Sequence, residues 1–197
     1  MSTPGHYFES VYADSADPWD FAGSWYELRR YGLLVASLPE RRYRVCFEPA
    51  CSVGVLTESL AARCDEVHAV DVVDAAAEQA RRRISRAGLA HVSVRTADAL
   101  APWPRPACDL LVLSEFLYYT AADRLDALIR DLLRLVESGG TGVAGHWLGR
   151  AEGHAGPTPG RCGPLQRVVG PRACVRRFVR GGVSDTTSRD GRFHARP

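Results

Sequence analysis

The stretch 45–57, VCFEPACSVGVLT, has the residue types of a ligand-binding turn. It begins as a short apolar strand, turns through the small residues Ala50, Ser52 and Gly54, and continues as an amphipathic run. Small residues let a ligand lie against the backbone, and the N-terminus of the following helix points free N–H groups at it. In a doubly wound sheet such a strand-turn-helix unit opens a nucleotide crevice. The stretch therefore predicts a site of this kind.

Strand and helix patterns alternate through the middle of the chain and would position this turn. Apolar runs predict strands over 44–47, 67–71, 91–95, 109–113 and 141–147. Apolar spacing predicts helices over 54–63, over 74–87, and from a Thr120 capping box to Glu137. This alternation predicts an α/β fold, a Rossmann-like doubly wound and mostly parallel sheet with helices on both faces. The ligand should lie at the carboxyl ends of the first, second and fourth strands.

Residues 4–31 are unusually rich in aromatic side chains. Ser24 can cap a helix that runs to about Leu38, where Pro39 ends it. Helical spacing predicts that one face of this helix is buried, made of Trp25, Leu28, Gly32 and Val35. Two interpretations stay open for the segment: aromatic packing that covers the sheet, or a lid that lines a ligand site.

Charge and periodicity both change near residue 150. Residues 1–150 hold 16 Arg against 20 acidic residues, whereas residues 151–197 hold 9 Arg against 3. Past Gly149 no apolar period persists, and only the pairs 168–169 and 178–179 could belong to short strands. We expect an aromatic lid or helix region over 1–40 and a ligand-binding domain over 41–150. We expect residues 151–197 to be an Arg/Gly-rich tail, disordered or translated out of frame.

Composition argues against several other classes of protein. The six Cys form no C-x-x-C pair, and we expect no metal site. No apolar run reaches membrane-spanning length, and the N-terminus lacks a basic and apolar signal. We therefore expect a cytoplasmic protein with reduced thiols and no membrane partner.

The motif 48–54, EPACSVG, resembles the first motif of class I S-adenosylmethionine-dependent methyltransferases, an acidic residue followed by three small residues at alternating positions. The resemblance continues in order along the chain. It implies that S-adenosyl-L-methionine is the cofactor and that the matching positions hold it. These are Glu48, Ala50, Ser52 and Gly54 in the motif, Asp71 and Val72 at the ribose hydroxyls, Asp98 and Ala99 beside the adenine, and Ser114 at the methionine moiety.

Within that superfamily the chain resembles the nodulation protein S group. The likeness covers residues 7 to about 150 and is carried by three segments: DPW at 17–19, WYELRRY at 25–31 and SEFLYY at 114–119. Members of the group are implied to methylate nitrogen on amino sugars or similar small acceptors. The resemblance therefore implies an S-adenosylmethionine-dependent N-methyltransferase with a small-molecule acceptor, such as an amino sugar or a related oligosaccharide intermediate.

Acceptor-side residues follow from the same comparison. Methyl transfer from a sulfonium needs mostly alignment, and a base is needed only where the acceptor carries a proton. Glu115 and His146, at the ends of the fourth and fifth strands, are the candidate catalytic bases, although His146 also fits a core histidine. The candidate acceptor-binding residues are Tyr7, Trp25, Arg29, Tyr118 and Tyr119.

Two features depart from the family pattern. The first small residue of the motif is normally Gly, and here it is Ala50, which costs on the order of 1 kcal/mol if its φ is positive. We therefore expect weakened cofactor binding. The fold also normally ends in a helix and an antiparallel strand pair. Residues 155–197 do not resemble those elements, so we expect the C-terminal strands to be missing or degenerate.

Three other functions compete with this one. A dinucleotide-dependent oxidoreductase would need G-x-G-x-x-G so that a pyrophosphate can approach the backbone. A nucleic-acid base methyltransferase would suit the basic tail, but the SEFL segment after the fourth strand lacks the Asn/Asp-Pro-Pro-aromatic loop. An inactive or truncated relative stays the main alternative because of Ala50 and the tail. We expect no nucleic-acid partner and leave the oligomeric state open.

Overall fold

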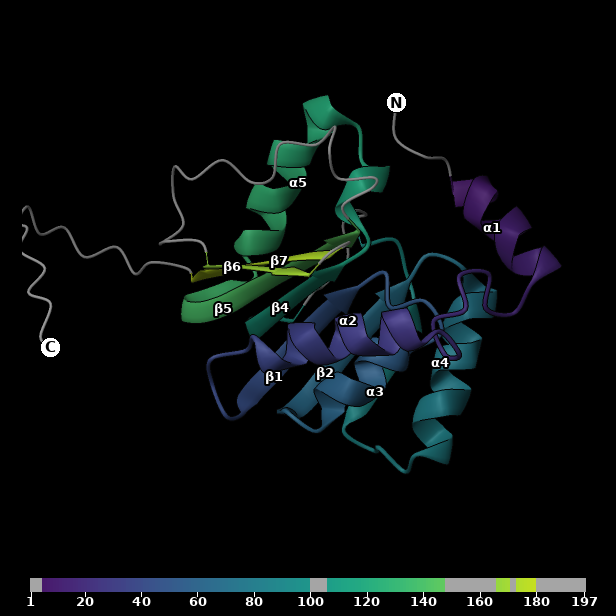
Figure 1. The fold of residues 1–197 in the computed structure, drawn as a ribbon, viewed down its shortest axis with the longest axis horizontal. Coiled ribbons are helices and arrows are strands. Elements are labelled where there is room, and N and C mark those ends of the chain that lie inside the picture. The colour runs from purple at the N-terminus through teal and green to yellow at the C-terminus, as the bar shows by residue number, and fades with distance from the viewer. Residues whose placement is uncertain (1–4, 100–105, 148–165, 171–172, 180–197) are drawn as a thin grey trace, which may run out of the picture.

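The computed structural model describes residues 5–99, 106–147, 166–170 and 173–179. Its centre is a seven-stranded sheet with the order β3-β2-β1-β4-β5-β7-β6 (Figure 1). The first five strands are parallel, whereas β7 pairs antiparallel with both β5 and β6. The bounds are β1 Tyr43–Pro49, β2 Cys64–Asp71, β3 Val92–Thr96, β4 Cys108–Ser114, β5 Val136–Trp147, β6 Gln166–Gly170 and β7 Ala173–Val179.

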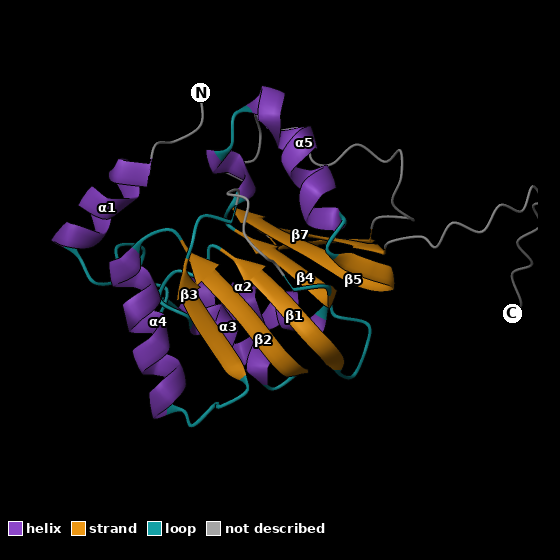
Figure 2. Cartoon of the chain, turned by 180° about the vertical axis from the view of Figure 1, so that it is seen from behind, coloured by secondary structure: helices purple, strands orange, loops and turns teal. Residues whose placement is uncertain are grey.

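Helices cover both faces of this sheet. The α2 and α3 helices lie together on one face of the sheet. The α5 helix lies on the opposite face (Figure 2). The predicted α/β class and doubly wound parallel sheet are confirmed. The bounds are α1 Gly5–Asp14, α2 Trp25–Ala36, α3 Val55–Ala61, α4 Asp74–Arg86, the short 3-10 helix η1 Leu117–Tyr119 and α5 Ala122–Leu133.

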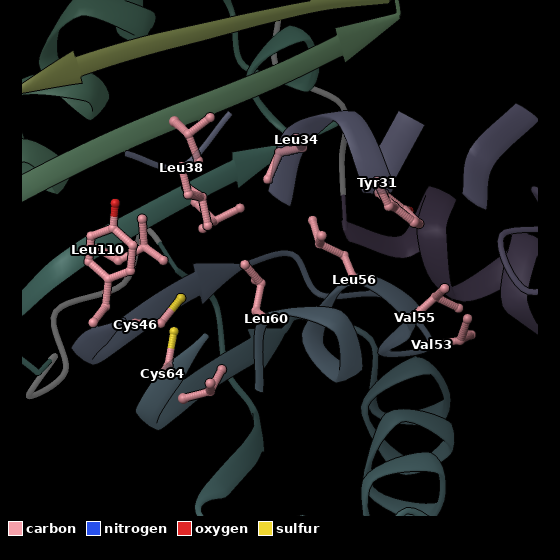
Figure 3. Close-up of a cluster of buried hydrophobic side chains, with 14 of the residues drawn as sticks. Tyr31, Leu34, Leu38, Cys46, Val53, Val55, Leu56, Leu60, Cys64 and Leu110 are labelled. Atoms are coloured by element: carbon pink, nitrogen blue, oxygen red, sulfur yellow. The ribbon is translucent and has the colours of Figure 1, made fainter. Parts of the chain in front are cut away.

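Two hydrophobic cores lie on the two faces because side chains alternate along each strand. Cys46 of β1 and Leu110 of β4 belong to the core under α2 and α3, to which Leu34 and Leu60 also contribute (Figure 3). Their chain neighbours Phe47 and Leu111 belong to the core under α5. Central strands buried on both faces read as continuous apolar runs, which is why the sequence located them.

The buried face of α2 differs from the expected one. Trp25 is 74% exposed and Leu28 is also exposed, whereas Arg30, Tyr31 and Leu34 are buried. The predicted face is therefore wrong. The physical reason is that the charge of Arg30 is neutralised by carboxylates inside the fold, so the helix turns a polar residue inward.

The end of α5 also differs from the expected one. The helix ends at Leu133, and Val136 is a buried residue of β5 instead of the last apolar residue of the helix. Val136 pairs with Cys108, and the register then shifts before Leu110 pairs with Thr141. Gly139 accommodates this irregularity with a φ of 82°. At the other end of α5 the N-cap is Ala121, and no side chain caps it, so the expected Thr120 box does not form.

Two strands are present where the C-terminal strands were expected to be missing or degenerate. β7 pairs with β5 from Thr141–Val179 to Trp147–Ala173, and β6 pairs with β7. The expectation that the C-terminal strands are missing is therefore wrong for β6 and β7. The two apolar pairs that the sequence offered, 168–169 and 178–179, lie in these strands. The rest of the predicted tail, residues 151–165, 171–172 and 180–197, lies outside the described residues, and its reading frame stays a prediction.

Candidate functional site

A cavity of about 370 Å³ lies at the carboxyl ends of β1, β2 and β4, where the topology predicts a ligand site. Its walls come from segments far apart in the sequence, including α1, the segment after it, the turn before α3, and η1. Among the described residues that line it, none is basic. Five are acidic: Glu27, Glu48, Asp71, Asp98 and Glu115. The cavity therefore has the electrostatics of a cation-binding site.

The turn between β1 and α3 has three left-handed residues in alternation. The φ angles are 57° at Ala50, 51° at Ser52 and 77° at Gly54. Left-handed backbone costs a non-glycine residue roughly 1–2 kcal/mol, so Ala50 and Ser52 both carry this strain. Ala50 lines the cavity. Gly54 does not line it, but a Cβ there would come within 2.9 Å of the Ala80 Cβ, so this position must be Gly for α4 to pack.

Asp71 holds this turn from the end of β2. One carboxylate oxygen accepts the backbone N–H of Ser52 at 2.8 Å, and the other accepts that of Val73 at 3.0 Å. Burial raises the pKa of Asp71, and these backbone donors oppose the rise. Val72 lies beside it at the cavity wall and is 46% exposed. Asp71 therefore fixes the turn and faces the cavity at once.

Glu48 is a buried acid at the end of β1. Thr57 of α3 donates its hydroxyl to the Glu48 Oε2 atom at 2.7 Å. Burial raises the pKa of Glu48 to about 8, and the Thr57 hydrogen bond offsets only part of this rise. Glu48 is therefore largely protonated at neutral pH, and it can donate as well as accept a hydrogen bond.

Asp98 and Ala99 line the cavity next to Asp71, where the sequence placed them. The link is direct, because the Ala97 N–H donates to the Asp71 carbonyl at 2.8 Å. The residues that directly follow β3 therefore form part of the cavity wall, next to the end of β2. Trp103, on the following loop, lies outside the described residues.

Ser114 and Glu115 end β4 at the cavity. The Ser114 Oγ atom is buried and has no hydrogen-bond partner among the described residues. Glu115 has a φ of 54°, and its N–H donates to the Gly145 carbonyl at 2.9 Å. A strained residue of this kind persists where the surroundings determine it, and such residues cluster at functional sites.

Arg30 is the residue of this site that sequence reasoning missed. It is 2% exposed and lies between two carboxylates of the cavity wall. Its Nη1 donates to the Glu115 Oε1 at 2.5 Å, and its Nε donates to the Glu27 Oε2 at 2.8 Å. Burial would lower the pKa of Arg30, but the two carboxylates outweigh it and raise the pKa. The only sequence signal was the three-residue spacing between Glu27 and Arg30.

Aromatic residues of the N-terminal segment line the cavity and also pack on the core under α2 and α3, so both interpretations of this segment stay open. Phe8, Tyr12, Trp19 and Phe21 all line it. Phe8 of α1 meets the Tyr119 ring edge-on, with ring centroids 4.8 Å apart. The segment therefore joins α1 to the opposite wall of the cavity.

The candidate acceptor-binding residues divide into two groups. Tyr118 and Tyr119 line the cavity. The cavity is not lined by Tyr7, Trp25 or Arg29. Tyr7 is 43% exposed, and the Arg29 Cζ atom lies 5.9 Å from the centroid of the exposed Trp25 ring. The backbone of His146 lies in β5, opposite Cys174, while its side chain lies outside the described residues.

The described part of the chain has neither a metal-binding cluster nor a membrane-spanning helix. No group of three or more His, Cys, Asp or Glu residues there could hold a metal ion. Within the same residues, no helix is long and apolar enough to span a membrane.

Comparison with known proteins gives relatives of one family. The model of the family described as Nodulation protein S (NodS) matches residues 9–156. A nodulation protein S from Rhizobium tropici is 32% identical over 131 residues, which is 66% of this chain and 54% of that protein. One from Bradyrhizobium diazoefficiens is 32% identical over 122 residues, 61% of this chain and 57% of that protein. The chain thus spans about half the length of these curated relatives.

A solved structure shares the fold. The N-methyltransferase NodS from Bradyrhizobium japonicum WM9, in complex with S-adenosyl-L-homocysteine, aligns with a TM-score of 0.74 at 22% identity. The alignment covers 90% of this chain and 99% of that one. The strand order, the strained turn after β1 and the family match over most of the sequence agree with one another, and the chain belongs to the nodulation protein S family.

Proposed function

We propose that this chain binds S-adenosyl-L-methionine and transfers its methyl group to nitrogen on an amino sugar or a related oligosaccharide intermediate. The observation that carries the proposal is the acidic cavity beside the strained turn after β1. Five carboxylic acids and no basic lining residue suit a cationic cofactor without phosphates. The NodS structure that shares this fold was solved with S-adenosyl-L-homocysteine bound, which supports the same cofactor here.

The residues at the cavity fit this cofactor. A buried hydroxyl without a partner, such as Ser114 Oγ, is disfavoured unless a ligand satisfies it. Asp71 and Val72 would hold the ribose, and Asp98 and Ala99 would hold the adenine. Ala50, Ser114 and the protonated Glu48 would hold the methionine end, with Ser52 and Gly54 shaping the turn behind it.

The cofactor supplies a methyl group bonded to a sulfonium sulfur. The sulfur leaves as a neutral thioether, so the leaving group is already activated. The task of the chain is therefore to align the acceptor and to manage its proton. The acceptor nitrogen needs a free lone pair, which forms the new N–C bond as the S–C bond breaks. Glu115 is the described group placed to take the proton that the nitrogen loses, and Tyr118 and Tyr119 would shape the acceptor pocket. His146 stays a second candidate base.

The same electrostatics disfavour the other ligands. The pyrophosphate of a nicotinamide dinucleotide would meet Asp71 and Asp98, and like charges in a partly buried site repel. A nucleic-acid backbone would meet the same repulsion. We therefore propose a small molecule as the methyl acceptor. An inactive relative is the alternative that Ala50 and Ser52 favour, because strain in the turn would weaken the cofactor site.

The proposal is tested by a transfer assay on the full-length chain. S-adenosyl-L-methionine is mixed with a glucosamine tetrasaccharide, and mass spectrometry follows the gain of one methyl group. The N-acetylated tetrasaccharide is the matched control, since its nitrogens have no free lone pair. We expect methylation of the amine and none of the amide. Cofactor binding without transfer to any amine would contradict the acceptor class, and absence of cofactor binding would contradict the activity itself.

A further inference from the structure

The mechanism above uses Glu115 but leaves a buried charge unexplained. Arg30 does not line the cavity, yet its guanidinium is buried directly behind two acids that do. A buried charge is strongly disfavoured unless it is paired and hydrogen-bonded. Arg30 is paired twice, with Glu27 in its own helix and with Glu115, which lies 85 positions away in the sequence.

We propose that Arg30 is a positioning residue that holds the Glu115 carboxylate in one orientation at the cavity and keeps it ionised. This inference rests on the proposed function, because it assigns a role to Arg30 within that same site. Glu27 is the second member of the arrangement, since it shares the guanidinium with Glu115.

Both oxygens of Glu115 are held. Oε1 accepts from Arg30 at 2.5 Å, and Oε2 accepts from the Tyr118 hydroxyl at 2.5 Å. Tyr118 remains a donor because burial, and then the charge of Glu115, raise its pKa. With one donor on each oxygen, the carboxylate has little freedom to rotate, and each donor favours its charged form.

The guanidinium itself is fixed as well. Its central carbon lies 4.8 Å from the Tyr31 ring centroid, and Tyr31 is buried in the core under α2. A guanidinium has donors on three nitrogens in one rigid plane, so it can meet two carboxylates at once, while a lysine ammonium is a point charge on a flexible stem. The described titratable groups near Glu115 include Arg30, Glu27 and Tyr31 from α2 and Tyr118 from η1.

The strained backbone of Glu115 agrees with this role. A residue in the left-handed region needs surroundings that hold it there. Here the Glu115 N–H is tied to Gly145 of β5, and the side chain is tied to α2 and η1. Three elements of the fold, β5, α2 and η1, thus determine where a single carboxylate points.

The test compares two variants whose effects differ in sign. Arg30→Met removes the positive charge and keeps a long, unbranched side chain. Glu27→Gln removes the negative charge of Glu27, so that Arg30 keeps Glu115 as its carboxylate partner. The titration midpoint of Glu115 is followed by carbon-13 NMR of its carboxyl carbon, assigned through Glu115→Gln. We expect the midpoint to rise by about one to three pH units in Arg30→Met and to fall in Glu27→Gln. The matched control is Arg29→Met, on the exposed side of the same helix, which should leave the midpoint unchanged.

Activity provides the second readout. In Arg30→Met we expect kcat for the glucosamine tetrasaccharide to fall about a hundredfold at neutral pH. The affinity for S-adenosyl-L-homocysteine should stay within about threefold, since Arg30 does not line the cavity. Arg30→Lys should restore part of kcat and part of the midpoint.

The results separate this inference from the proposed function. A Glu115 midpoint that does not move, or that moves the same way in both variants, overturns the positioning role even if methyl transfer is confirmed. Opposite shifts in a chain that transfers no methyl group would support the role and overturn the activity. If Arg30→Met does not fold, the isosteric Glu27→Gln alone decides, because a constant or rising midpoint there also contradicts the inference.

Discussion

The hydroxyl of Tyr12 lies 2.5 Å from the Oγ of Ser52, so a hydrogen bond joins α1 to the strained turn after β1. Ser52 also gives its backbone N–H to Asp71. A single small residue therefore links the aromatic segment, the turn and the end of β2. With Gly at this position, the hydroxyl that makes the first of these links would be absent.

Tyr12→Phe should loosen α1 and weaken cofactor binding. A hydrogen bond of this kind contributes about 1 kcal/mol, so we expect a roughly fivefold loss of affinity for S-adenosyl-L-homocysteine and faster proteolysis near the N-terminus. Tyr7→Phe is the control, because Tyr7 is on the same helix and does not line the cavity. Calorimetric titration measures the affinity. Equal affinities in the two variants would show that the Tyr12–Ser52 contact has no part in binding.

Ala50→Gly should stabilise the turn. Glycine adopts the φ of 57° without the cost of roughly 1–2 kcal/mol that Ala bears, although its greater freedom in the unfolded chain offsets part of the gain. We expect a higher free energy of unfolding in urea and tighter binding of S-adenosyl-L-homocysteine. Ala75→Gly, on the exposed side of α4, is the control and should lose about 1 kcal/mol. Poorer affinity in Ala50→Gly would mean that the Ala50 methyl itself contacts the ligand favourably.

Gly54→Ala should destabilise the fold for two separable reasons. The new Cβ would lie 2.9 Å from the Ala80 Cβ, and the φ of 77° disfavours any side chain. Overpacking and left-handed strain together should cost about 2–5 kcal/mol. Gly88→Ala has a similar φ of 68° but nothing within 4 Å of the new Cβ, so it should show the strain alone. Equal losses in urea unfolding would rule out the close packing of the turn on α4.

Glu48 should make the stability of the chain fall as pH rises. Its folded pKa of about 8 lies above the ordinary value of 4.5, so the unfolded chain releases this proton first. Between these two pKa values, the free energy of unfolding falls by at most about 1.4 kcal/mol for each pH unit. Glu48→Gln should remove this contribution and narrow the stability difference between pH 5 and pH 8.

The control for that measurement is Glu9→Gln, an exposed acid of α1. It should leave the pH dependence of urea unfolding unchanged. If Glu48→Gln behaves in the same way as this control, Glu48 is ionised in the folded chain, and the protonated donor described above does not exist.

Much of the fold and the cofactor side of the cavity could be predicted because both depend on local patterns. Apolar runs such as 109–113 are central strands, and an acid at the end of a strand, such as Asp71, falls at the sheet edge where ligands bind. Only the pairs 168–169 and 178–179 of β6 and β7 could be proposed as strand residues, because β7 is interrupted by two adjacent Arg residues and its pairing with β5 is not local.

The acceptor side of the cavity could not be predicted in the same way. Helical periodicity assigned Trp25 to the buried face of α2 and did not assign Arg30 to it, whereas Trp25 is exposed and Arg30 is buried. Glu27 and Glu115 together pair the buried Arg30, and Glu115 lies 85 residues away, so no pattern within α2 reveals this second partner.

The measurement that tests the central claim most directly is calorimetric titration of the full-length chain with S-adenosyl-L-homocysteine, with NAD as the control ligand. We predict binding of the first in the micromolar range and none of the second, because acidic side chains accept hydrogen bonds from the ammonium group and ribose hydroxyls of the first ligand and repel the pyrophosphate of the second. A cooperatively folded chain that binds neither ligand, or that binds NAD, would contradict the assignment of this cavity as a methyl-donor site.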